Sequence, residues 1–160
     1  MADTKKVAIS DNFLISYAKI PKHEQKKVRE FLDAFKDNPK AKRFNYEKLE
    51  YAEDPNLYSV RIDQAYRGIV HKPKAQDTYL VVWVDHHDEA YKWAEHKLFS
   101  IHPETGALQL VDISPGMQEK TRELEEASGD GLFKDFTEHR LEKIGVPNVL
   151  LPLVKSLKRR

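Results

Sequence analysis

The sequence predicts an α+β protein in which an N-terminal helical hairpin packs on a small antiparallel sheet, followed by a small helical C-terminal extension. Two stretches with the apolar spacing of amphipathic helices come first. Three short runs rich in β-branched and aromatic residues follow, and turn-like breaks separate them. The end of the chain carries a second helical pattern of its own.

The helical hairpin follows a short predicted strand at residues 7–9. Apolar residues between positions 13 and 20 predict a helix that is capped by Ser10 or Asp11 and ended by Pro21. A second helix is predicted to end before Asn38-Pro39. Both helices must bury an apolar stripe, and the strands that follow offer the surface. Residues 40–55 are polar and predict a loop with a helical turn.

The three runs at residues 57–62, 66–71 and 79–84 predict a meander of consecutive antiparallel strands. Because side chains alternate along a strand, Arg61 and Arg67 are expected on the face opposite the core. The third run is apolar at every position, which is typical of a strand covered on both sides. We therefore expect a core face and a second, partly cationic face.

A third helix is predicted after the meander, with Asp88 as its cap. His87 and Tyr91 would then lie one helical turn apart, beside the end of the last strand. The run His86-His87-Asp88 lacks the spacing of metal ligands, because adjacent residues point in different directions. We expect no metal and no cofactor.

Composition indicates a soluble globular protein, since 40% of the 160 residues are hydrophobic and 33% are charged. The absence of cysteine excludes disulfide and thiolate chemistry, and the N-terminus lacks the apolar run of a signal peptide, so we expect a cytoplasmic protein. No apolar run approaches the ~20 residues that cross a bilayer. The net charge of +1 gives no global attraction to nucleic acid, so binding would need a local patch. Residues 57–74 contain one, formed by Arg61, Arg67, Lys72 and Lys74.

The sequence predicts that the chain is organised in three segments. They are a domain at residues 1–98, a connecting segment with an edge strand at 99–131, and a helical hairpin at 132–160. Residues 107–113 alternate in polarity and predict the edge strand or part of the connection, and Ser128-Gly-Asp-Gly131 is the linker candidate. Gly145 as a helix stop and Pro147 as a helix start predict the hairpin.

Three motifs carry a resemblance to a known family. They are Leu57-Tyr-Ser-Val-Arg61, Ala65-Tyr-Arg67, and Trp83-Val-Asp-His-His87 followed by Tyr91. After a helical hairpin, this arrangement resembles the RelE/ParE toxin superfamily over roughly residues 7–95. The resemblance implies a small toxin, held inactive by an antitoxin protein, that enters the ribosome and cleaves mRNA as a metal-free endoribonuclease.

The resemblance implies that Arg61, Arg67, His87 and Tyr91 are catalytic. Lys72, Lys74 and His86 are expected to bind flanking RNA, and Glu47 or Glu50 could serve as general base. Two residues depart from the family pattern: Ser59 stands where the nucleases carry lysine, and His87 stands where many carry arginine. Histidine is a competent proton carrier near neutral pH.

The tail carries a second resemblance. Residues 141–157, LEKIGVPNVLLPLVKSL, are similar to the segment before the motor domain of UvrD/Rep-like DNA helicases that carry a RelE-like domain. No GxxxxGK[ST] loop is present, so this chain would not hydrolyse ATP itself. The alternative function is therefore a non-catalytic module that binds nucleic acid or protein, with a helicase domain downstream. A ParE-like action on DNA gyrase is a third hypothesis, against which the catalytic-looking residues argue.

Overall fold

A computed structural model describes residues 5–102, 104–116, 133, 135–155 and 157. The chain divides into two compact units, Met1–Glu95 and His96–Arg160. Within the described ranges, no helix is both long enough and apolar enough to cross a membrane. The predicted linker at residues 128–131 lies outside the described residues. The predicted boundaries at residues 98 and 131 stay predictions.

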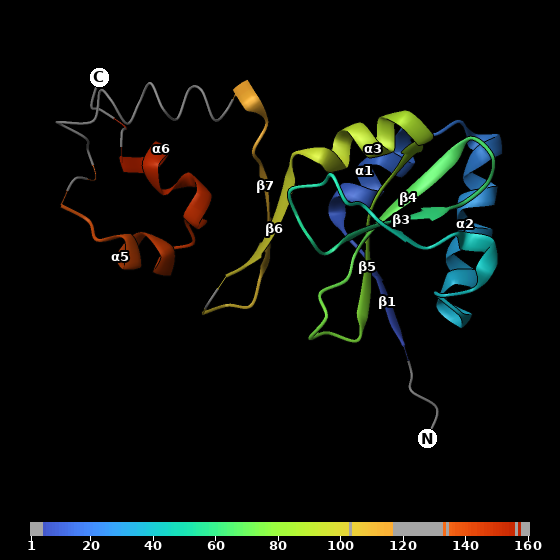
Figure 1. Ribbon diagram of the computed structural model, residues 1–160, viewed down its shortest axis with the longest axis horizontal. Helices are drawn as coiled ribbons and strands as arrows, with labels where there is room; N and C mark the ends of the chain where they lie inside the picture. Colours follow the sequence, from blue (N-terminus) through green and yellow to red (C-terminus); the bar gives the residue numbers. More distant parts are fainter. Residues whose placement is uncertain (1–4, 103, 117–132, 134, 156, 158–160) are drawn as a thin grey trace. The chain divides into compact units, whose positions relative to one another are not determined.

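The first unit is a five-stranded sheet with helices on both faces (Figure 1). Its elements are β1 (Lys6–Ile9), α1 (Asp11–Lys19), α2 (Lys22–Asp37), the 3-10 helix η1 (Lys42–Phe44), β2 (Glu47–Lys48), β3 (Leu57–Arg61), β4 (Tyr66–His71), β5 (Thr78–His86) and α3 (His87–Glu95). The strand order is β1-β5-β4-β3-β2, with β1 parallel to β5 and all other neighbours antiparallel. The fold is therefore α+β, and β3, β4 and β5 confirm the predicted meander.

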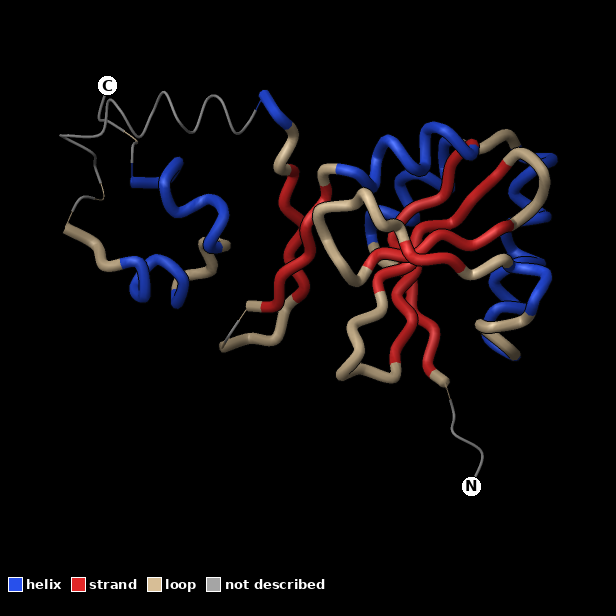
Figure 2. The backbone as a smooth tube through the Cα atoms, viewed as in Figure 1, coloured by secondary structure: helices blue, strands red, loops and turns tan. Residues whose placement is uncertain are grey.

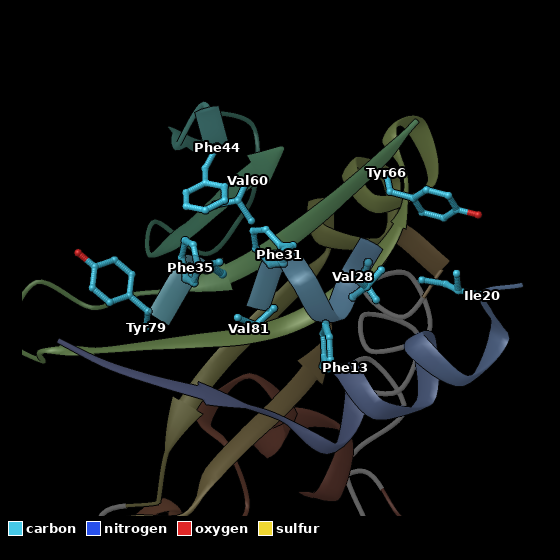
Figure 3. Packing of buried hydrophobic residues seen from close by; sticks show 12 residues of the cluster. Phe13, Ile20, Val28, Phe31, Phe35, Phe44, Val60, Tyr66, Tyr79 and Val81 are labelled. Carbon is cyan, nitrogen blue, oxygen red and sulfur yellow. The ribbon is translucent and has the colours of Figure 1, made fainter. Parts of the chain in front are cut away.

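Helices α1 and α2 cover one face of this sheet and form the core with it (Figure 3). Phe31 and Phe35 from α2 meet Phe44 from η1, with ring centroids 5.2 to 5.4 Å apart. Val60 and Val81 from the strands complete the cluster and are fully buried. Burial of the apolar faces of the two helices against the meander thus offsets the conformational entropy that the helices lose on folding.

The ends of the helices follow local capping rules in α1 but not in α3. The Ser10 side chain accepts a hydrogen bond from the N–H of Phe13, as expected of a cap. Helix α3 begins at His87, directly after β5, so Asp88 lies in its first turn and our expectation that it caps the helix is wrong. The N–H of His87 donates to the carbonyl of Ala65 at 2.8 Å, where the chain passes from strand to helix two residues earlier than expected.

The second unit contains a two-stranded antiparallel sheet of β6 (Lys97–Ile101) and β7 (Leu108–Asp112) (Figure 2). The strand expected at residues 107–113 is thus confirmed as β7. Helix α5 (Glu138–Lys143), the 3-10 helix η3 (Asn148–Leu150) and α6 (Leu151–Lys155) follow. Gly145 adopts a φ of 100° after α5, and Pro147 precedes η3, as expected of a helix stop and a helix start. The predicted hairpin at residues 132–160 stays a prediction.

Candidate functional site

Two arginines face each other on the sheet surface that α1 and α2 leave free. Arg61 at the end of β3 pairs in register with Arg67 at the start of β4, so both side chains project to the same face. Arg61 is exposed, and its side chain has no hydrogen bond or ion pair among the described residues. This confirms the expectation that the two arginines share a face.

A tight turn between β3 and β4 fixes Arg67. Its Nη1 donates to the carbonyls of Asp63 and Tyr66 at 2.7 and 3.0 Å. Burial alone would raise the pKa of Asp63, but hydrogen bonds from the N–H groups of Tyr66 and Ala65 and from Lys27 lower it. The ionised carboxylate therefore holds the turn, and the turn holds one side of the Arg67 guanidinium.

Helix α3 brings a histidine and a tyrosine over the same face. The His87 and Tyr91 rings lie nearly perpendicular, with centroids 4.4 Å apart. The Tyr91 hydroxyl donates to the Ser59 Oγ at 3.4 Å, and Ser59 is buried two residues before Arg61 on β3. Two residues span about 7 Å along a strand, so the Ser59 and Arg61 backbones lie about that far apart. His87 is exposed, with its Nδ1 at 2.8 Å from the carboxylate of Asp88.

A carboxylate joins this face from the edge strand. Glu47 on β2 pairs in register with Ser59, which places the two side chains on one face with Cβ atoms about 5 Å apart. Glu47 is exposed. Glu50 is also exposed, in the turn that follows β2. Of the two candidate bases, Glu47 is therefore the one that the sheet register brings beside Ser59 and Tyr91.

Three of the expected RNA-binding residues lie apart from this cluster. Lys72 and Lys74 follow the far end of β4. Lys72 comes five positions after Arg67, which corresponds to roughly 17 Å along the strand. The Lys72 ammonium bonds to the carbonyls of Pro73 and Gln76. His86 stacks on Tyr66, with ring centroids 4.4 Å apart, on the face that α2 covers. Their role in RNA binding stays a prediction.

A cleft of about 250 Å³ is lined by Arg61 together with residues of α2 and η1, such as Phe31 and Arg43, and by none of Arg67, His87 and Tyr91, so it does not unite the four expected catalytic residues. Instead, Arg61 and Arg67 share a sheet face by register, and α3 brings Tyr91 over that face at Ser59. Among the described residues, no three His, Asp or Glu side chains gather closely enough to hold a metal ion.

Sequence reasoning missed one exposed ring beside the cluster. Tyr51 lies in the loop between β2 and β3, and its ring is perpendicular to that of Tyr91 at a centroid distance of 6.1 Å. The sequence predicted only a polar loop with a helical turn for residues 40–55. No local pattern could have shown the contact, since it depends on how the loop returns toward α3.

The fold and this face together define an α+β protein with a cationic sheet surface that also carries a carboxylate, a histidine and a tyrosine. Its solved structural neighbours include toxins and toxin–antitoxin complexes of the RelE and YoeB/ParE kind. No protein-family model matches the sequence, and no curated protein matches it significantly.

Three neighbours illustrate the likeness. The toxin–antitoxin complex RelBE2 from Mycobacterium tuberculosis has 20% identity and a TM-score of 0.44, covering 54% of this chain and 95% of the other. The RelE–RelB complex from Pyrococcus horikoshii has 24% identity and a TM-score of 0.42, covering 52% and 94%. The isolated Escherichia coli RelE toxin has 16% identity and a TM-score of 0.39, covering 56% and 97%.

Proposed function

We propose that the chain is a RelE-like toxin module, an endoribonuclease that cleaves mRNA on the ribosome by acid–base catalysis. The observation that carries the proposal is the sheet face that holds Arg61 and Arg67 as register partners, because the Tyr91 of the His87–Tyr91 ring pair bonds to Ser59 on that same face. The sequence motifs quoted above support the same class. An open face, rather than a closed pocket, suits a substrate presented by a large partner.

The proposed reaction is an internal transfer at the RNA phosphate. Glu47 takes the proton of a 2′-hydroxyl, the 2′-oxygen forms a bond to phosphorus, and the bond to the 5′-oxygen breaks. His87 supplies the proton that the leaving 5′-oxygen needs. The products are a 2′,3′-cyclic phosphate and a 5′-hydroxyl, so atoms and charges balance.

Arg61 and Arg67 would stabilise the phosphate as negative charge gathers on it in the transition state. Guanidinium suits this role because it stays charged and meets phosphate oxygens two at a time. Tyr91, held by Ser59 at 3.4 Å, would position the reacting nucleotide or His87. A nuclease of this kind would arrest its own host, so we propose that an antitoxin protein inhibits it.

The second candidate is a non-catalytic module that binds nucleic acid or protein ahead of a UvrD/Rep-like helicase. Ser59 favours it, because a buried hydroxyl stands where the resemblance leads one to expect a lysine. The helicase-like segment at residues 141–157 favours it as well. The two candidates differ in whether RNA is cut.

The test is induced expression in bacteria, with RNA ends mapped on translating ribosomes. We expect growth arrest and new cuts inside codons for the wild type, and neither for the Arg67→Ala, His87→Ala double variant. Lys19→Ala removes an exposed cation from the last turn of α1, which covers the other face of the sheet; it is the matched control and should cut like the wild type. Absence of cuts by a folded wild-type protein would leave the binding module.

A further inference from the structure

Tyr51 differs from every other aromatic side chain of the protein. All Phe, Tyr and Trp residues fall within the part of the chain that the structure describes, and only Tyr51 is exposed. Its side chain is 54% exposed, whereas Tyr91 beside it is half-buried. A tyrosine whose only role is packing in the core would have its ring covered by neighbouring side chains.

Backbone hydrogen bonds fix the loop that carries Tyr51, both at the base of the loop and to the end of α3. At its base, Leu49 and Leu57 are joined by a backbone hydrogen bond of 3.0 Å. The N–H of Glu53 donates to the carbonyl of Glu95 at the end of α3, at 3.2 Å. The exposed ring is thus presented by a fixed loop, which limits the entropy lost when a ligand packs on it.

A buried pair anchors the same loop to the sheet. Asp54 is 1% exposed, and its carboxylate accepts the N–H of Asn56 and lies 3.6 Å from the Nε2 of His71 on β4. Since Asp54 is only three residues from Tyr51, this anchor also fixes where the tyrosine ring stands relative to the sheet face.

Building on the proposed nuclease function, we propose that Tyr51 is a stacking platform for an unpaired base of single-stranded RNA, next to the nucleotide whose phosphate meets Arg61 and Arg67. Every base has a π-face, so an aromatic ring of this kind binds RNA without needing a particular sequence. The perpendicular packing against Tyr91 uses the edge of one ring, and the exposed surface of Tyr51 remains for a base.

The charges around the ring set the orientation of the RNA. Glu50, Glu53 and Glu95 are exposed near Tyr51 and would repel a phosphate, whereas Arg61 and Arg67 attract one. The base would therefore lie over the loop and the backbone would run toward the arginines. Burial, Tyr91 and Glu95 raise the pKa of Tyr51, so its hydroxyl stays neutral beside the RNA.

The experiment compares Tyr51→Phe and Tyr51→Leu in the mapping of RNA ends on ribosomes. Phenylalanine keeps the ring and should cut like the wild type. Leucine keeps the apolar character without the ring, and we expect roughly 5- to 150-fold fewer cuts, the range that a lost base–aromatic stack gives. Leu14→Ala, another exposed apolar side chain, is the control that should change nothing. Thermal unfolding should show unchanged stability for each variant.

The outcomes separate this inference from the proposed function. If the wild type makes no cuts, the proposed function fails and the inference fails with it. If the wild type cuts and Tyr51→Leu cuts equally well, only the stacking role is overturned. A Tyr51→Leu variant that cuts normally but escapes inhibition by a protein partner would also overturn it, because Tyr51 would then serve a protein interface.

Discussion

Arg61 and Arg67 stand opposite each other on neighbouring strands, where like charges destabilise a sheet. Asp63 does not relieve the repulsion, since its carboxylate bonds to the turn and to Lys27, whereas Asp85 on β5 pairs in register with Arg67 and offsets part of it. A phosphate between the two guanidinium groups would relieve it. At the residue scale, the arginine pair is therefore a place where binding of an anion and stability of the free protein oppose each other.

This opposition gives a prediction for Arg61→Gln. Removal of one of two facing cations should leave stability unchanged or raise it by up to ~1 kcal/mol, measured by urea unfolding. Cleavage should fall about 100-fold or more, because a group that stabilises the transition-state charge is lost. Lys19→Gln on α1 serves as the control for loss of a single exposed cation. A variant that is less stable and still cuts would contradict the account.

The buried pair of His71 and Asp54 predicts a pH dependence of stability. Burial lowers the pKa of His71 from 6.5, although the Asp54 carboxylate opposes the shift. Below 6.5 the unfolded chain binds a proton at His71 that the folded chain does not, so stability is complete above that pH and is lost as pH falls toward the folded pKa. Urea unfolding between about pH 5 and about pH 8 should show this loss in the wild type and a smaller one in His71→Gln. Equal pH dependence in both proteins would refute the assignment.

At the scale of elements, Gly68 on β4 has no room for a side chain beside β3 and α2. A Cβ at this position would lie 2.9 Å from the Val60 Cγ2 and 3.9 Å from the Phe31 Cε1. Glycine thus lets β4 pack under α2 without displacing the core. The contact between α1 and β5 also depends on one side chain, since the buried Ser16 hydroxyl accepts a hydrogen bond from the N–H of Val84 at 3.1 Å.

Gly68→Ala should destabilise the protein by ~1 to 3 kcal/mol, as overpacking of a full core does. Val60→Ala removes the methyl group that the new Cβ would meet. The double variant should therefore be more stable than the two separate losses predict, which a double-mutant cycle from urea unfolding measures. Strictly additive losses would show that the crowding lies elsewhere.

Periodicity predicted most elements, because α1, α2 and the meander bury faces whose spacing is visible in the sequence. It also predicted that Arg61 and Arg67 share a face, since alternation along strands is local. The two-residue strand β2 was missed because so short a strand has no alternation, and Glu47 could not be placed without it. Tyr51 was missed because its contact with Tyr91 is set by the fold of a loop, and no local pattern encodes that.

For the whole molecule, the division into two units means that the core cluster and the proposed site both belong to residues 1–95. We predict that a chain of residues 1–95 unfolds cooperatively on its own, because every member of the cluster is retained. Circular dichroism on heating checks this. A gradual change without a transition would show that residues 96–160 are needed for the fold.

In the proposed reaction, the residues on this face transfer the RNA phosphate from the 5′-oxygen to the neighbouring 2′-oxygen. The most direct measurement adds the purified protein to ribosomes that hold a defined mRNA, with and without a single 2′-deoxynucleotide at the site of cutting. The account predicts fragments with a 2′,3′-cyclic phosphate and a 5′-hydroxyl, and loss of the cut at the deoxy position. Fragments with 5′-phosphate ends, or cutting that persists without the 2′-hydroxyl, would contradict it.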